Sequence, residues 1–470
     1  MTDSVPTATT LDPASTVADL GSGAVREESA DVIVVGAGPG GSATAAYLAT
    51  AGLDVVLLEK ATFPRDKICG DGLTPRAVRE LAQLGVSTRQ EDGWIRNKGL
   101  RIVGGGRRFE LDWPETDHYP PYGMVRPRKV LDHLLAQHAV SRGARLLEGM
   151  NVTGALRAQG GPRTGRIEGV TATVRDAQGK DTGARRTFRA PVVVAADGNS
   201  SRLSVSMGRR KRTDRPMGVA VRTYYSSPTR TNDDYMESWL ELWVPEDPEA
   251  AADPAAHGDP SVKRILLPGY GWIFACGDGT ANVGLGMLST SPAFGRVDYR
   301  DVMRRWVATL PEEWTFHADT MTGPIRGDAL PMALNRRPLS ADGLLLVGDA
   351  AGMINPFNGE GIDYALEAGR LAAEVIVSAR TRADDASRDR VLSSYDAIIS
   401  DRLGGYYTLG RGFAALIGRP EVMKRCVKYG LPITPLMRVL MKGMANLAEP
   451  KGSRIDDRLL NALSRLAPSA

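Results

Sequence analysis

Two glycine-rich segments, far apart in the chain, carry the clearest chemical signal. In the first, an apolar run enters a turn containing Gly36, Gly38 and Gly41, and the next apolar run ends at Glu59. This spacing lets the backbone turn tightly, approach a pyrophosphate and pack a helix behind it, while the acid is placed to bind a ribose hydroxyl. The pattern predicts a dinucleotide site. Its expected contacts are Gly36, Gly38, Gly41, Glu59 and the adjacent Lys60.

The second segment, Gly343–Asp363, reads as a buried strand that ends at Gly348 and Asp349. We expect a helix to open there, so that the Asp349 carboxylate lies at a positive helix start beside a polar part of the ligand. One glycine fingerprint alone indicates a dinucleotide of either kind. The two segments together favour FAD over NAD as the cofactor.

Two further residues, Asp197 and Arg128, lie at the ends of predicted elements and could reach the same site. Asp197 and Gly198 follow the apolar run VVVAA, and this strand favours a place at the back of the cofactor site over a plain hairpin turn. Arg128 precedes a helical pattern. Two interpretations of Arg128 stand: it contacts a cofactor phosphate, or it is a solvated arginine at a helix start.

The polar loop Phe63–Leu73 contains Cys69 between residues that permit close backbone approach, Gly70 and Gly72. This favours an active-site cysteine over a small buried one. Tyr270 and Trp272 alternate with glycines, so that a strand would present both rings on one face. We expect the small neighbours to leave that face open, which favours a substrate wall over ordinary core packing.

Composition limits the other possibilities. The 470 residues carry a net charge of +4 from 59 basic and 55 acidic side chains, so no nucleic-acid partner is expected. The five histidines show no metal-ligand spacing, and three scattered cysteines suit a reducing cytoplasm better than a disulfide framework. No apolar run approaches the roughly 20 residues of a spanning helix. We expect a cytoplasmic protein without a metal.

The order of apolar patterns predicts an α/β fold: a Rossmann-type FAD-binding domain, an inserted and mostly antiparallel β-sheet substrate domain, and a helical C-terminal region. The segments are assigned as follows: a disordered tail at 1–30; the discontinuous FAD-binding domain at 31–93, 121–216 and 331–378; the substrate domain at 94–120 and 217–330; the helical region at 379–470.

Near the C-terminus, Leu436, Leu440, Met444 and Leu447 fall on one helical face, and several lysines and arginines lie close by. Two interpretations stand. The helix packs on the sheet domain, or it forms a basic amphipathic surface that rests on anionic lipid at the inner face of the cell membrane and admits an apolar substrate.

These motifs resemble known flavoproteins. DVIVVGAGPGGS, the step at Asp197 and VGDAAGMINPFNGEGI are similar to the group that includes para-hydroxybenzoate hydroxylase. FPRDKICGDGLTPRAV, LPGYGWIF and NPFNGEGIDYALEAGR resemble the geranylgeranyl reductase family over nearly the whole chain from about residue 30, with Ala275 where the family has proline. The resemblance implies that Cys69 lies over the flavin ring. It also implies FAD contacts at Arg128, Asp349, Gly359, Gly361 and Ile362.

The activity that this resemblance implies is saturation of an isoprene double bond in a polyprenyl chain by an FAD-dependent reductase, most similar to the actinobacterial enzymes that act on menaquinone. Cys69, Tyr270 and Trp272 are the expected catalytic residues, and the proton donor is Cys69, Tyr270 or an ordered water. With one dinucleotide fingerprint, the electron donor stays open between NAD(P)H and another carrier.

Two alternatives remain beside it. One is reduction of geranylgeranyl diphosphate or a lipid. The diphosphate would need a basic cluster, and the run Arg209–Arg212 reads instead as a solvated linker. The other is an aromatic monooxygenase or halogenase of natural-product biosynthesis. Trp239 and Trp243 lack the Trp-x-Trp-x-Ile-Pro spacing of a halogenase, whereas no motif excludes a hydroxylase.

Overall fold

The computed structural model describes residues 26–160, 164–247, 250, 261–450, 452 and 454–468. Residues 1–25 of the expected tail lie outside this range, as do residues 251–260 of the expected substrate domain. The tail expected over 1–30 is wrong at its end, because Arg26–Ser29 forms strand β1 and pairs in parallel with β12 (Asp181–Arg189). Backbone hydrogen bonds to the edge of a sheet order this segment, although its composition alone predicts no regular structure.

A six-stranded sheet forms the centre of the predicted FAD-binding domain. In spatial order its strands are β21 (Ser340–Ala341), β22 (Leu344–Leu346), β13 (Val192–Ala195), β2 (Val32–Val35), β3 (Val55–Leu58) and β9 (Arg145–Leu147). All pairs except β21 with β22 are parallel. The continuous apolar runs at β2, β3 and β13 are buried throughout, as expected of parallel strands covered on both faces.

The helices packed around this sheet include one, α9, from the segment assigned to the helical C-terminal region. They are α2 (Pro39–Thr50), α3 (Pro75–Leu84), α4 (Arg128–Ser141), α5 (Arg202–Ser206), α8 (Ile362–Arg380) and α9 (Asp385–Ile399). The helix expected to open at Asp349 is wrong: residues Gly348–Ala350 make a single 3-10 turn, and the long helix begins only at Ile362. Gly352 and Gly359, both with positive φ, keep the intervening chain out of helical conformation.

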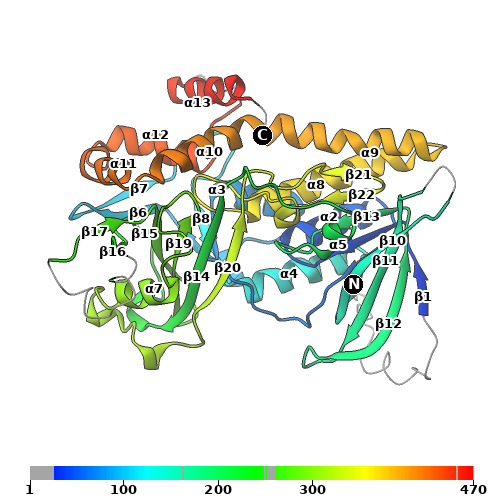
Figure 1. Cartoon of the computed structure of the whole chain (residues 1–470), viewed down its shortest axis with the longest axis horizontal. Coiled ribbons are helices and arrows are strands. Elements are labelled where there is room, and N and C mark those ends of the chain that lie inside the picture. Colours follow the sequence, from blue (N-terminus) through cyan, green and yellow to red (C-terminus); the bar gives the residue numbers. More distant parts are fainter. Residues whose placement is uncertain are drawn as a thin grey trace, which may run out of the picture.

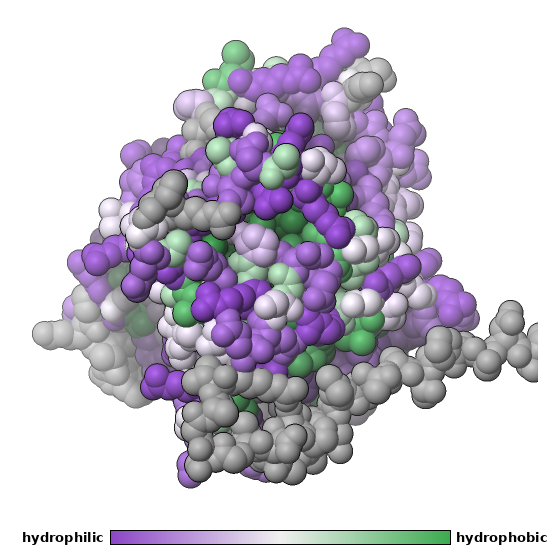
Figure 2. Space-filling model, turned by 90° about the vertical axis from the view of Figure 1, so that its right-hand side faces the viewer, coloured by the Kyte–Doolittle hydropathy of each residue, from purple (hydrophilic) through white to green (hydrophobic). Residues whose placement is uncertain are grey.

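A second sheet stands at one end of the molecule, and the sequence analysis did not predict it as a separate sheet. Its order is β1, β12, β11 (Ile167–Arg175) and β10 (Met150–Arg157). It lies at the right of Figure 1, beyond the central sheet. The end of the molecule seen from that side is largely hydrophilic, with smaller apolar areas between the polar residues (Figure 2).

The substrate domain is built on a seven-stranded sheet at the left of Figure 1. Its order is β20 (Arg326–Pro331), β14 (Met217–Ser226), β19 (Thr280–Leu288), β18 (Gly269–Ala275), β15 (Tyr235–Trp239), β6 (Gly99–Gly104) and β7 (Arg107–Asp112). All pairs except β15 with β6 are antiparallel, so the expected mostly antiparallel sheet is present. The underside of this sheet is covered by α7 (Tyr299–Val307), and β16 (Trp243–Pro245) pairs with β17 (Arg264–Leu266) beside it.

A small three-stranded sheet joins the two domains. Its order is β4 (Gly72–Leu73), β8 (Gly123–Val125) and β5 (Ile95–Asn97). Residues Ile95–Asn97 of the segment 94–120 therefore pair with β8 and not with the seven-stranded sheet, and β8 pairs on its other side with β4, at the end of the Cys69 loop. Backbone hydrogen bonds between β4 and β8 therefore fix the position of the end of the Cys69 loop.

The C-terminal helices lie across one edge of the seven-stranded sheet, at the top left of Figure 1. They are α10 (Gly405–Ile417), α11 (Pro420–Arg425), α12 (Thr434–Met444) and α13 (Ile455–Leu466), with π-helical turns at Ser400–Gly404 and Cys426–Gly430. Met437 and Met441 of α12 are buried in one cluster with Trp272 and Phe274. Across the described residues, no helix has both the length and the apolar character needed to cross a bilayer.

Candidate active site

A cavity of about 780 Å³ runs between the domains, from the glycine turn after β2 to the C-terminal helices. It is mainly apolar near the helices and polar near the glycine turn. The predicted site residues that line it are Gly36, Gly38, Glu59, Lys60, Cys69, Arg128, Asp197, Tyr270, Trp272, Asp349, Gly359, Gly361 and Ile362. Of the predicted set, only Gly41 does not, because its role is internal packing.

The three glycines of the turn have the separate roles that their spacing predicts. A Cβ on Gly36, whose φ is +99°, would overlap the carbonyl oxygen of Ala196, and a Cβ on Gly41 would overlap that of Gly36. In contrast, no described atom lies within 4 Å of the corresponding position on Gly38, which borders the cavity. The first and third glycines therefore close the turn, and the second leaves room for a pyrophosphate beside the start of α2.

Glu59 follows β3 directly and is buried at the cavity edge. Its Oε2 accepts hydrogen bonds from the backbone N–H of Ala37 at 3.1 Å and from Nη2 of Arg65 at 3.2 Å. The carboxylate thus ties the glycine turn to the following loop. Sequence analysis missed Arg65, which lies in that loop and also pairs with Asp132 at 2.7 Å.

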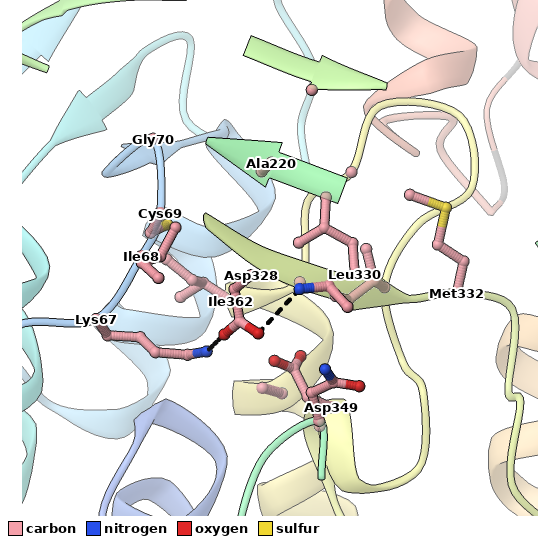
Figure 3. Close-up of a pocket in the computed structure, with 18 of the residues that line it drawn as sticks. Lys67, Ile68, Cys69, Gly70, Ala220, Asp328, Leu330, Met332, Asp349 and Ile362 are labelled. Carbon is pink, nitrogen blue, oxygen red and sulfur yellow. Dashed lines mark hydrogen bonds and ion pairs between the residues drawn. The ribbon is translucent and has the colours of Figure 1, made fainter. Parts of the chain in front are cut away.

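Asp197 and Asp349 offer polar groups to the cavity from the segments that follow the neighbouring strands β13 and β22. Burial raises the pKa of both carboxyls, and nearby Lys67 and Arg128 oppose that rise at Asp349. Oδ2 of Asp197 accepts from the N–H of Leu203 at 3.2 Å, whereas its Oδ1 is buried without a partner among the described residues. Figure 3 shows the Asp349 carboxylate directed toward the ion pair of Lys67 and Asp328.

Arg128 is the first residue of α4, and it is buried, so its interpretation as a solvated helix-start arginine is wrong. Its guanidinium binds both oxygens of Asp132 one turn later, at 2.6 and 2.8 Å. The side chain borders the cavity. Contact with a cofactor phosphate stays a prediction.

The Cys69 loop is held against the substrate sheet by side chains that sequence analysis missed. Arg222 of β14 donates from Nε to the Cys69 carbonyl at 3.3 Å and pairs with Asp66 at 2.5 Å. Asn282 of β19 donates to the same carbonyl at 2.8 Å. Both are polar residues inside apolar strands, which is the available sequence signal. Burial raises the pKa of the Cys69 thiol, so it keeps its proton at neutral pH.

Tyr270, Trp272 and Phe274 share the cavity face of β18, with neighbouring ring centroids 6.1 and 6.5 Å apart. The predicted aromatic wall is therefore present. The expectation that the neighbouring glycines of the same strand leave this face open is wrong, because Gly271 lies on the opposite face, where Trp306 packs on it. Space beside Trp272 comes from Gly284 and Gly286 of β19, because antiparallel pairing brings their bare backbone under the ring.

The first interpretation of the C-terminal pattern, packing on the sheet domain, is confirmed, and contact with lipid stays a prediction. Met437 and Met441 pack on the sheet domain, while Leu436, Leu440 and Met444 line the apolar end of the cavity. The run Arg209–Arg212 was expected to be a solvated linker, and this expectation is wrong for Arg209. Arg209 is buried and donates to the Ala341 carbonyl at 2.6 Å.

Comparison with known proteins assigns the family. A model described as an FAD-binding domain matches residues 29–257. A menaquinone reductase of Mycobacterium tuberculosis is 38% identical over 421 residues, covering 90% of this chain and 92% of that protein. A digeranylgeranylglycerophospholipid reductase of Methanopyrus kandleri is 32% identical over 74% of this chain and 80% of its own length. The chain belongs to the geranylgeranyl reductase family of FAD-dependent oxidoreductases.

Comparison with a solved structure confirms the fold. A geranylgeranyl bacteriochlorophyll reductase-like protein of Thermoplasma acidophilum superposes with a TM-score of 0.67 at 22% identity, covering 93% of this chain and all of that one. The cofactor is FAD, and the residues present fit it. Gly38 leaves backbone space, Asp349 faces the cavity, and Oδ1 of Asp197 is buried without a described partner.

Proposed function

We propose that this family member saturates an isoprene double bond in a polyprenyl chain, and that its substrate is menaquinone. One observation carries the proposal. The cavity continues from the FAD-binding residues past Cys69 and Trp272 to the apolar side chains of Leu436 and Leu440. This shape suits an extended hydrocarbon tail. The identity to menaquinone reductases over nearly the whole chain supports the choice of quinone.

An isolated trisubstituted alkene is not an electrophile, so it needs a proton as well as a hydride. FAD, when bound and reduced, supplies the hydride. The chain supplies the surroundings of the positive charge that develops on the tertiary carbon. The faces of Tyr270 and Trp272 line the cavity where they can stabilise such a charge by cation–π attraction. Apolar neighbours such as Phe274 and Met437 line the same cavity and limit the water that could trap it.

Two side chains at the wall hold a proton at neutral pH. Burial raises the pKa of both the Cys69 thiol and the Tyr270 phenol. The Tyr270 hydroxyl donates to the Asn358 carbonyl at 2.7 Å, whereas the Cys69 sulfur accepts from the Asp71 N–H at 3.4 Å and keeps its own proton available. We therefore favour Cys69 as the donor, with Tyr270 and an ordered water as the alternatives.

Anaerobic incubation tests the reaction class. Purified protein is mixed with menaquinone in detergent and with dithionite, and the quinone is analysed by mass spectrometry. We expect a gain of two hydrogens in the tail. A monooxygenase or halogenase would require oxygen and leave the tail unchanged, and that outcome would refute the proposal.

The same assay distinguishes the lipid substrates. Geranylgeranyl diphosphate is added in place of menaquinone. Faster reduction of the diphosphate would favour the alternative substrate, although the cavity end formed by α12 presents Leu436, Leu440 and Met444 and not a basic cluster. Quinones from a deletion strain give the matching test in cells: tails that stay as saturated as before would exclude menaquinone.

We also propose that the cavity opens toward a membrane. Leu436 lines the cavity and is 41% exposed, and Ile433 beside it is 50% exposed. Lys424, Arg425 and Lys428 lie in the preceding turns. Such a surface binds anionic lipid from one side, so the protein would be cytoplasmic and peripheral.

Vesicle sedimentation tests this surface. We expect binding to phosphatidylglycerol vesicles, reduced in the double variant Lys424→Glu with Lys428→Glu. The control is Arg390→Glu on the distant helix α9 (Figure 1). Equal loss in both variants would mean a general charge effect. The electron donor is tested separately by anaerobic mixing with NADH or NADPH: rapid bleaching of the flavin identifies a nicotinamide, and its absence favours another carrier.

A further inference from the structure

Asn282 is a fully buried polar residue in the middle of β19, and it contacts both functional parts of the cavity wall. Its Nδ2 donates to the carbonyl of Cys69 at 2.8 Å and to Oδ2 of Asp71 at 2.7 Å. Its Oδ1 accepts from the indole N–H of Trp272 at 2.9 Å. The reverse amide orientation would bring two donors together at the indole, so the partners fix the orientation.

Asp71 completes this connection from the loop side. It has a positive φ of 66° and a fully buried carboxylate. Beside Asn282, its donors are the Tyr224 hydroxyl at 2.7 Å and the backbone N–H of Arg128 at 3.0 Å. A buried carboxylate is tolerated only when such donors replace its water. The loop that carries Cys69 is therefore held in place by hydrogen bonds to β14, β19 and α4.

The loop also lies directly on the aromatic wall. A Cβ on Gly70 would lie 3.2 Å from the Phe274 ring and 3.4 Å from the indole nitrogen of Trp272. A small displacement of the loop would therefore change the separation between Cys69 and the wall. Among the described residues, Asn282 is the one side chain bonded to the loop backbone, to Asp71 and to the wall.

We propose that Asn282 is a positioning residue, which fixes the distance between the Cys69 loop and the Trp272 ring through its three hydrogen bonds. The alternative is that Asn282 only satisfies buried polar groups and that loop position does not depend on it. The inference rests on the proposed function for its relevance to turnover, but its test needs no substrate.

The test compares Asn282→Asp with Asn97→Asp. Asn97 is a matched control because it is buried on β5 and accepts from the indole N–H of Trp113 at 2.8 Å, yet it does not line the cavity. Alkylation by N-ethylmaleimide is followed by peptide mass spectrometry on the FAD-loaded enzyme and on the protein stripped of FAD. Exposed Cys426 serves as the internal reference.

At pH 8 we expect Asn282→Asp to raise the alkylation rate of Cys69 relative to Cys426 about tenfold, as the loss of a net hydrogen bond and a new repulsion would do. Asn97→Asp should leave that ratio unchanged. An equal rise in both variants, or none in Asn282→Asp, would overturn the proposal. In turnover, a positioning role lowers kcat more than it raises KM.

The pH dependence of Cys69 alkylation gives a second readout, because it should have opposite signs in the parent protein and in Asn282→Asp. Burial raises the pKa of Asp71 to about 6, against hydrogen bonds from Tyr224 and Asn282. The charged and titratable groups around it are Arg222, Tyr224, Cys69 and Cys276, with the Arg128 backbone. In the parent, protonation of Asp71 below that pH removes an acceptor and loosens the loop.

In Asn282→Asp, two carboxylates face each other, and the proton bound at low pH bridges them. Its excess alkylation should therefore shrink as the pH falls, whereas alkylation in the parent should increase, both measured against Cys426. If Asn282→Asp does not fold, Tyr224→Phe replaces it, because this change removes only the hydroxyl donor to Asp71. We expect it to raise the Cys69 ratio several-fold, and an unchanged ratio would refute the role of this network. Failure to reduce menaquinone, with the loop result intact, would refute only the proposed function.

Discussion

The space beneath Trp272 gives the sharpest stability prediction, for Gly284→Ala. A Cβ on Gly284 would lie 2.5 Å from the carbonyl oxygen of Val221 and 2.6 Å from Cβ of Arg222, and closer still to the Trp272 ring. Ordinary contact begins near 3.4 Å, so neighbours on two strands must move by about 0.9 Å. Overpacking of this kind costs about 1–3 kcal/mol of the free energy of unfolding.

Gly286→Ala is the matched control, since it lies two residues further along the same face of β19. There the nearest atom to an added Cβ is Cζ3 of Trp272 at 3.7 Å, an ordinary contact. Loss of glycine freedom in the unfolded chain should make this variant more stable by about 0.4–1 kcal/mol. The two variants should therefore differ by roughly 2 kcal/mol.

Urea denaturation of the FAD-loaded protein, followed by tryptophan fluorescence, measures this difference. Near-ultraviolet circular dichroism reports whether the environment of Trp272 has changed. If Gly284→Ala is as stable as Gly286→Ala, then the ring is not confined by the β19 backbone as the structure indicates. Activity is not the comparison here, because Gly286 borders the cavity.

Three other predictions concern the reaction and the cofactor. Cys69→Ala should keep FAD but slow alkene reduction in a single turnover by at least about tenfold, a loss typical of a missing general acid; an unchanged rate would remove Cys69 from the mechanism. Asp349→Ala should lower the ratio of flavin to protein absorbance after purification, and a full FAD content would refute its contact. Burial raises the pKa of Glu360 from 4.5 to about 7, so the folded state keeps a proton that the unfolded chain has lost. The free energy of unfolding should therefore fall as the pH rises through that window, and Glu360→Gln should flatten this slope in denaturation at several pH values.

The cofactor half of the site was predictable because its signals are local. Gly36 and Gly41 must be glycines to avoid the backbone that they approach, and Glu59 must follow a strand to reach the turn. Such constraints act between residues that are close in the sequence, so a local pattern reveals them. The substrate half was predictable only in part: Tyr270 and Trp272 share a face because strands alternate, but the glycines that make room for them are on another strand.

The sequence by itself determined the FAD-binding turn, the α/β architecture, the irregular loop around Cys69 and the family resemblance. Only the tertiary structure decided how that loop is held. Its partners include Arg222, Tyr224 and Asn282, which lie on strands more than 150 positions away from Cys69. A further partner is the backbone of Arg128, at the start of α4. Hydrogen bonds between such distant residues depend on sheet register and packing, which no local pattern encodes. The tertiary structure likewise placed Leu436 and Leu440 at the far end of the cavity that begins at Gly38.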